Sequence, residues 1–381
     1  MPRGDAPEIG RDVLDPRDPA PRWSWLPARR AALGLSASAA PSLMFILVGL
    51  GLGPAALGVL PAEALTRLDP VVSVALATLG VFIGLGLGAM RAPGTAAVLL
   101  AASVEMALTM VVVTGAMYVL LSRWAVPLPV DAALFSAILG VCSSASAAMR
   151  VTERAAPDVR SAARIADMDD VPLVVLATFA VTAVAARPIG EATLLTVAAA
   201  IAAGTAGWLL FERARGAPER SVFVTGAVLL LGGIGAYLGS SPLLSGCVAG
   251  LIWVRTPGAA DRIIGADLRR LQHPLVALLL IVAGASIQWT LALLWISAPL
   301  VLLRLTGKLL ASAAAAWMTG VPAGLLATIL VPPGVIGVAV ALNVQQVLDS
   351  PNTLLLSGVT VAAGVSELLS ALLPGEREDS C

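Results

Sequence analysis

The chain has 381 residues, of which 58 % are hydrophobic and 13 % charged, and its formal net charge at pH 7 is zero. Its mean hydropathy is +0.91. A soluble domain carries about 25 % charged residues, so this chain cannot cover itself with a polar surface. The apolar content also excludes a disordered protein, and the balanced charge excludes a nucleic-acid-binding surface. The sequence is that of a membrane protein.

Long apolar blocks without strict alternation predict an all-α, polytopic protein rather than a transmembrane barrel. Residues 1–30 are rich in Pro, Arg and Asp and are expected to form a disordered cytoplasmic tail. A transmembrane domain is expected over residues 31–375, followed by a short cytoplasmic tail over 376–381. We predict about twelve transmembrane helices, at residues 33–60, 71–90, 95–122, 130–151, 163–185, 189–212, 219–238, 241–255, 267–288, 290–318, 321–347 and 352–374.

Arginines predict the orientation in the membrane, because Lys and Arg are enriched in cytoplasmic loops. With twelve helices, the arginine-rich segments 22–30, 150–164, 213–220 and 255–270 share one side with Arg91. The other side receives only Arg67, Arg123 and Arg187. Both termini are therefore expected in the cytoplasm, with the protein spanning the inner (plasma) membrane several times.

Two glycine-rich stretches read GLGLG, at residues 49–53 and 84–88. A dinucleotide-binding loop would need a preceding strand and a following acidic residue, which are absent here. We interpret both stretches as sites of close helix packing by small residues. Pro54 is expected to end or kink the first helix.

Seven ionisable residues fall inside the predicted helices, where each charge costs roughly 2.5–3.5 kcal/mol. They must face a cavity or one another. These residues are Glu105, Asp167, Asp169, Asp170, Arg304, Lys308 and Glu367.

Lys308 is the only lysine in the chain, and it lies in the middle of a predicted helix. Arginine stays protonated, whereas a lysine away from water can release its proton near neutral pH. This choice of residue favours a proton-linked salt bridge at Lys308. A fixed partner for an aspartate is the alternative interpretation, and the two are compatible.

Asp169 and Asp170 are neighbours on a predicted helix and point about 100° apart, so one can pair with a cation while the other faces water. Two carboxylates this close resist simultaneous ionisation, so a water-accessible member can hold either a proton or a monovalent cation. Asp167, near Arg164 at the cytoplasmic end, also suits a helix N-terminus near the surface.

Two predicted helices contain interruptions. Ser143-Ser144-Ala145-Ser146 breaks the apolar run of the fourth helix, and Pro332-Pro333-Gly334 lies in the middle of the eleventh. Non-helical backbone at membrane depth is tolerated where it lines a cavity or is buried in protein. Such pairs indicate two inverted repeats with a binding site at the midplane, so we expect helices four and eleven to cross there.

The pattern resembles the bacterial monovalent cation/proton antiporters over roughly residues 41–370. The similar segments are Ala166-Asp167-Met168-Asp169-Asp170-Val171, Gly307-Lys308, Gly53-Pro54 and Val282-Ala283-Gly284-Ala285-Ser286-Ile287. The resemblance implies that Asp170 is the main cation and proton carrier, binding Na⁺ or K⁺ transiently. It also implies that Asp169 pairs with Lys308, that Ser144 and Ser146 supply hydroxyls to the site, and that the protein is a homodimer with an elevator-like core.

The sequence departs from this family at both interruptions. Ser144-Ala145-Ser146 stands where the family has Thr-Ser-Pro, and Pro332-Pro333-Gly334-Val335 stands where many members have Pro-Arg-Gly-Glu. Arg304, paired with Glu105 or Glu367, would replace the salt bridge lost in helix eleven. A member that no longer transports is the other interpretation of these departures.

The leading hypothesis is secondary transport, the exchange of Na⁺ (or K⁺) for protons by alternating access, with no cofactor and no enzymatic reaction. A sodium-coupled organic-anion symporter is the alternative, since broken helices suit it equally well. An intramembrane aspartyl protease would need two aspartates on different helices, whereas the aspartates here share one. The single His273 cannot build a zinc site.

Overall fold

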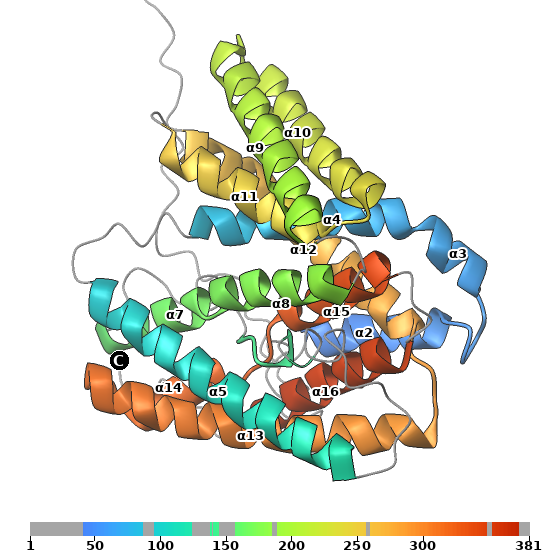
Figure 1. Ribbon diagram of the computed structural model, residues 1–381, viewed down its shortest axis with the longest axis vertical. Helices are drawn as coiled ribbons and strands as arrows, with labels where there is room; N and C mark the ends of the chain where they lie inside the picture. Colours follow the sequence, from blue (N-terminus) through green and yellow to red (C-terminus); the bar gives the residue numbers. More distant parts are fainter. Residues whose placement is uncertain are drawn as a thin grey trace, which may run out of the picture. The chain divides into compact units, whose positions relative to one another are not determined.

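The computed structural model describes residues 41–86, 95–123, 138, 140–144, 157–184, 189–256, 260–348 and 353–372. In these residues the regular structure is helical (Figure 1), which confirms the all-α fold class. The helices are α2 (Pro41–Leu52), α3 (Ala62–Arg67), α4 (Asp69–Gly86), α5 (Thr95–Arg123), α7 (Pro157–Met168), α8 (Asp170–Val184), α9 (Ile189–Arg213), α10 (Ala217–Leu238), α11 (Pro242–Arg255), α12 (Ala260–Ala285), α13 (Leu291–Thr319), α14 (Ala323–Leu330), α15 (Val335–Leu348) and α16 (Thr353–Leu372).

Helices long and apolar enough to cross a membrane are present throughout the described part of the chain. By length and composition they are Asp69–Gly86, Ala97–Arg123, Thr193–Arg213, Pro218–Leu238 and Leu291–Thr319, and five shorter apolar helices accompany them. The total of twelve spans stays a prediction, as does the inverted repeat. Residues 1–40 and 373–381, which include both predicted tails, lie outside the described residues.

The glycine-rich stretches pack helices tightly, as predicted. A Cβ added at Gly49 or Gly53 of α2 would overlap the backbone of α12 at Ile281 or Ala285, and one at Gly84 of α4 would overlap α11 at Cys247. Gly51 faces open space, so only part of each stretch serves this purpose. Close approach of backbones is how membrane helices gain packing energy without a hydrophobic driving force between them.

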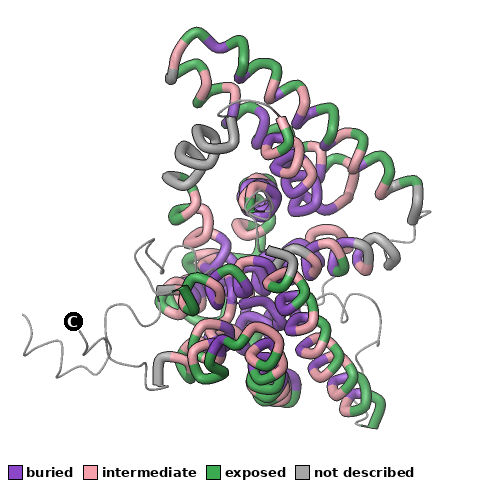
Figure 2. The backbone as a smooth tube through the Cα atoms, turned by 90° about the vertical axis from the view of Figure 1, so that its left-hand side faces the viewer, coloured by how far each residue is buried: buried purple, intermediate pink, exposed green. Residues whose placement is uncertain are grey.

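The longest helices, α5 and α13, pack against each other and cross at an angle (Figure 1). At Gly307 a Cβ would meet Thr109 of α5 at 3.5 Å, so the two helices are in ordinary van der Waals contact there. Buried residues gather where these and the neighbouring helices meet, and exposed residues cover the outward faces (Figure 2). The outward faces are rich in Leu, Val and Trp, as expected of surfaces that lipid covers.

Both predicted interruptions are confirmed where the structure describes them. The eleventh predicted helix divides into α14, ending at Leu330, and α15, beginning at Val335. The helical segment before Ser143 ends at residue 141, and Ser144 forms an antiparallel bridge with Pro333. The two broken helices therefore meet at their non-helical residues. Most of the fourth predicted helix, Ser146 included, lies outside the described residues.

The fifth predicted helix, 163–185, differs from the structure. It begins earlier, at Pro157, and divides at Asp169 into α7 and α8. Pro172 explains the break, because a proline has no N–H to donate to the carbonyl of Met168, four residues before it. The aspartate pair thus lies at the junction of two helices rather than on one continuous helix.

Candidate functional site

Lys308 of α13 is wholly buried and forms the centre of the candidate site. Its ammonium donates hydrogen bonds to Oε1 of Glu105 at 2.8 Å, to Oγ of Ser144 at 2.8 Å and to Oδ2 of Asp169 at 2.9 Å. An ammonium has three N–H donors, so all three are used. Glu105 lies in α5, Ser144 lies where the two broken helices cross, and Asp169 lies at the junction of α7 and α8. The expected pairing of Asp169 with Lys308 is therefore present in the structure.

The polar contacts around Lys308 fix its neighbours in turn. Thr109, one turn along α5, donates from Oγ1 to Oε1 of Glu105 at 3.3 Å. Ser144 donates its own hydroxyl to the carbonyl of Leu330 at 3.1 Å, while it accepts from Lys308. A buried polar side chain is stable in the membrane interior only when its donors and acceptors are matched in this way.

Two carboxylate oxygens in the cluster are not matched. Oε2 of Glu105 and Oδ1 of Asp169 are buried and have no hydrogen-bond partner among the described residues. Both side chains are almost inaccessible, at 0 % and 1 % exposure. An ionised carboxylate oxygen in a low-dielectric interior demands a proton, a cation or a water molecule. These two oxygens are therefore the places in the cluster where a proton, a cation or a water molecule would bind.

Asp170 is the first residue of α8, immediately after the junction. The N-terminus of a helix carries a partial positive charge, which stabilises a carboxylate placed there. Its backbone position next to Asp169 is described, whereas its side chain is outside the described part of the structure. The role predicted for Asp170 as cation and proton carrier stays a prediction.

Arg304, one turn before Lys308 on α13, is also buried, at 1 % exposure. It donates from Nε to the carbonyl of Val141 at 2.8 Å, from Nη2 to the carbonyl of Ser143 at 3.0 Å, and from Nη1 to the carbonyl of Val331. These carbonyls end the two broken helices, where the helix dipole is negative. The planar guanidinium can reach three acceptors that diverge in space.

The pairing proposed for Arg304 with Glu105 or Glu367 is wrong. Glu105 instead binds Lys308 and Thr109, and the donors of Arg304 are taken by backbone carbonyls. The physical reason lies in the breaks themselves: each interrupted helix exposes carbonyls that have no helical donor. A hydrogen-bond donor from another part of the chain must reach them if water is excluded. The sequence shows the breaks, but not which cation reaches them.

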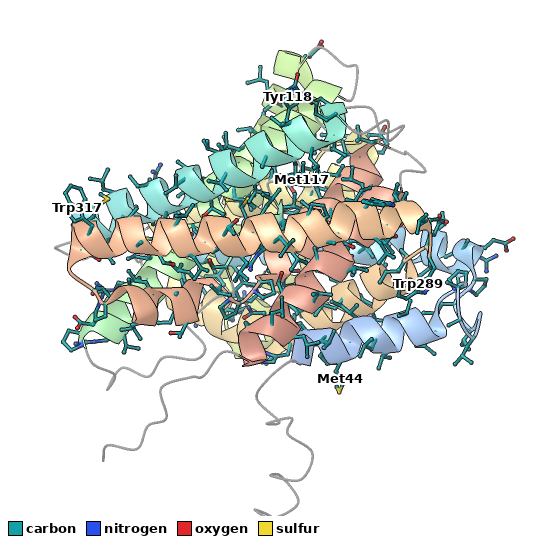
Figure 3. All side chains as sticks on the ribbon, turned by 90° about the horizontal axis from the view of Figure 1, so that it is seen from below. Met44, Met117, Tyr118, Trp289 and Trp317 are labelled. Carbon is teal, nitrogen blue, oxygen red and sulfur yellow. The ribbon has the colours of Figure 1, made fainter. Side chains whose placement is uncertain are left out.

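The cluster lies near the middle of a membrane-spanning helix. Trp295 and Trp317 on α13 are 51 % and 89 % exposed, and a rise of about 1.5 Å per residue places them about 33 Å apart along the axis. Tryptophans prefer the two interfaces of a hydrocarbon layer about 30 Å thick. Figure 3 shows Trp317 and Trp289 at opposite ends of α13. Lys308 is then about 13 Å from one interface and 20 Å from the other.

The remaining predicted site residues lie outside the hydrogen-bonded Lys308 cluster. Asp167 is half-buried in α7, one residue before its end, and Glu367 is half-buried in α16. Each makes at least one further interaction. Pro332 and Pro333 are half-buried and Gly334 is buried at the crossing. Thr109 and Pro172 are the participants that sequence reasoning missed, although a proline two residues after an aspartate pair is visible in the sequence.

A separate cavity of about 960 Å³ opens at one end of the helices. Its lining includes Ser73 and Asp69 of α4, the loop residue Gln288, and Gln345 and Gln346 of α15. No member of the Lys308 cluster is among its described lining residues. The described residues also hold no group of three or more His, Cys, Asp or Glu side chains suited to a metal ion.

Comparison with known proteins shows which solved fold this chain shares. No protein-family model matches the sequence, and no curated protein matches it either. Among solved structures, the chain is similar to the sodium proton antiporter MjNhaP1 from Methanocaldococcus jannaschii, with a TM-score of 0.60 and 16 % identity over 91 % of this chain and 95 % of that chain. The two chains share a fold. The expectation of a polytopic, antiporter-like architecture is confirmed at that level, whereas membership of the bacterial family stays a prediction.

Proposed function

We propose that this protein exchanges Na⁺ or K⁺ for protons across the membrane, with the Asp169–Asp170 pair as the carrier. The observation that carries the proposal is the 2.9 Å bond between Lys308 and Asp169 at a buried helix junction. A cation that binds the aspartate pair competes with this ammonium and with any proton on the carboxylates. Such competition for one site is the physical basis of exchange, and it needs no cofactor or enzymatic step.

Three further features support the proposal. The unmatched oxygens of Glu105 and Asp169 supply unmet negative charge. The broken helices place carbonyls and a helix N-terminus beside it, as in transporters with a midplane site. The fold is that of a solved sodium proton antiporter. By the sequence resemblance, Asp170 is the main ligand, Ser146 is a further hydroxyl, and the core moves against a dimeric scaffold.

Transport in proteoliposomes tests the exchange. The purified protein is reconstituted with an internal pH dye, and Na⁺ or K⁺ is added outside. We expect a cation-evoked pH change that Asp170→Asn abolishes and Asp169→Asn strongly reduces. Asp158→Asn, an exposed residue in the first turn of α7, is the matched control and should transport normally. Full activity of Asp170→Asn would overturn the assignment of the carrier, and the faster of the two salts identifies the cation.

Sodium-coupled symport of an organic solute is the second candidate, since the cavity of about 960 Å³ has the size of a small-molecule site. Its described lining contains Asp69 but no Lys or Arg, which disfavours an organic anion. Sodium-dependent uptake of a labelled organic acid, with no pH change on adding salt alone, would favour symport over exchange.

The membrane location and the homodimer are inferred from the sequence, and they are proposals too. The arginine bias places both termini in the cytoplasm and the protein in the inner membrane. A reporter fused to the C-terminus, active only in the cytoplasm, tests the orientation. The homodimer rests on the family resemblance, and the mass of the purified protein in detergent tests it.

A further inference from the structure

Lys308 contacts two carboxylates at once, and they belong to different parts of the fold. Glu105 lies at 2.8 Å and Asp169 at 2.9 Å, and both are as buried as the lysine. Arg304 is the other charged group acting on Lys308, and the nearby Cys142 is a buried free thiol. Arg304 donates to three backbone carbonyls, and the ion pairs of both carboxylates among the described residues are with Lys308. One ammonium therefore serves two carboxylates directly.

The two carboxylates differ in how firmly they are held. Glu105 lies in the interior of α5, which packs against α13 and contacts it closely at Thr109 and Gly307, beside Lys308. Thr109 also donates to the same oxygen of Glu105 that binds the lysine. Asp169 lies at the α7–α8 junction, where Pro172 removes a helical hydrogen bond. The Glu105 contact belongs to a continuous helix pair, and the Asp169 contact to a break.

We propose that Glu105 is a positioning residue that keeps the ammonium of Lys308 when Asp169 releases it to take up the transported cation. The proposal rests on the proposed function. Lys308 then stays positively charged and in place through the cycle, and only its bond to Asp169 exchanges. Without Glu105, release of Asp169 would leave an uncompensated ammonium in the membrane interior, which is strongly unfavourable. The second carboxylate therefore lowers the free-energy cost of the exchange at Asp169 near neutral pH.

Thermal unfolding in detergent tests the shared ammonium without any transport. Glu105→Gln and Asp169→Asn should each lower the unfolding midpoint modestly, because one counter-charge remains. The double variant should lose much more than the sum, since contacts to one group are not additive. Adding Lys308→Met to the double variant should restore folded protein. Additive single effects, or a triple variant no better than the double, would overturn the proposal.

Transport by Glu105→Gln tests the role in exchange. With Asp169 as the remaining counter-charge, the lysine leaves it readily only after losing its proton. The activity profile should therefore move to higher pH by about one unit, with a roughly tenfold higher half-saturating cation concentration at neutral pH. Glu105→Asp should restore part of both values, and Glu191→Gln, exposed on α9, should change neither.

The outcomes separate the two proposals. A variant of Glu105 that transports more slowly, with the wild-type pH profile and half-saturation, would show a purely structural residue and overturn the inference. Absence of any cation-evoked pH change in the wild-type protein would overturn the proposed function instead. In that case the unfolding measurements still decide whether Glu105 and Asp169 share the ammonium.

Discussion

The guanidinium of Arg304 lies 3.0 Å from the carbonyl oxygen of Ser143, to which its Nη2 donates a hydrogen bond. Through its other nitrogens, Arg304 also binds the carbonyls of Val141 and Val331, at the ends of the two broken helices. It thus stabilises the non-helical crossing that brings Ser144 to Lys308.

Replacing Arg304 with methionine should destabilise the protein severely. The buried carbonyls of Val141 and Val331 would lose the Arg304 donor, at about 1–3 kcal/mol each, and the Ser143 carbonyl would keep only the N–H of Gly334, so the loss is several kcal/mol. Folded protein recovered in detergent and its unfolding midpoint measure the effect. Arg304→Lys should recover only part of the stability, because a single ammonium cannot match the planar fork. Thr306→Ala on the exposed side of α13 is the control. Wild-type stability of Arg304→Met would contradict this role.

Ser144→Ala should weaken the hold on Lys308. It removes one of the three acceptors of the ammonium and the donor to the Leu330 carbonyl, a loss of about 1–3 kcal/mol. Ser144→Thr keeps the hydroxyl and should remain close to wild type. Thermal unfolding compares the three proteins. Equal stability of the alanine and threonine variants would show that the hydroxyl contributes little.

Pro172→Ala should close the junction between α7 and α8. Alanine at position 172 supplies an N–H that can donate to the carbonyl of Met168. A continuous helix then becomes favourable, and the unfolding midpoint should rise. Transport should fall by at least about tenfold, because the aspartate pair would lose its geometry. Pro70→Ala, at the second residue of α4, is a control that breaks no junction. Unchanged transport in Pro172→Ala would show that the break is not needed.

Gly246→Ala should disturb the packing of α11 on α4. Its Cβ would overlap the backbone of Ala77, and forcing extra volume into such a contact costs about 1–3 kcal/mol. Gly51→Ala is the matched control, since nothing lies near its Cβ position, and it should be neutral or slightly stabilising. Unfolding midpoints compare the two substitutions. A neutral Gly246→Ala would mean that the helices separate easily there.

The sequence predicted much of the helical fold because the length of an apolar segment is a local property. The bounds expected for the helices at 95–122 and 290–318 agree with α5 and α13 within one residue. The interruption at Pro332-Pro333-Gly334 was also visible, because proline removes a helical donor wherever it stands. The fifth helix was predicted as unbroken, although Pro172 carries the same signal.

The partners of the buried charges were less predictable. The sequence placed Lys308 and Asp169 together through a family resemblance, and it offered Glu105 as a partner of Arg304 rather than of Lys308. It assigned Arg304 to a carboxylate, whereas the structure gives it three carbonyls. Which groups meet depends on how α5, α13 and the crossing pack, and residues as far apart as Glu105 and Lys308 have no local pattern that joins them.

The amino-acid sequence by itself determined that this chain is a membrane protein, which segments are helical, and which ionisable residues need partners in the membrane. These properties follow from composition and segment length, because the free energy of transfer from water to lipid depends on those alone. Only the tertiary structure decided how those charges are shared. One ammonium lies between two carboxylates and one guanidinium lies among backbone carbonyls, since both arrangements arise from contacts between helices distant along the chain.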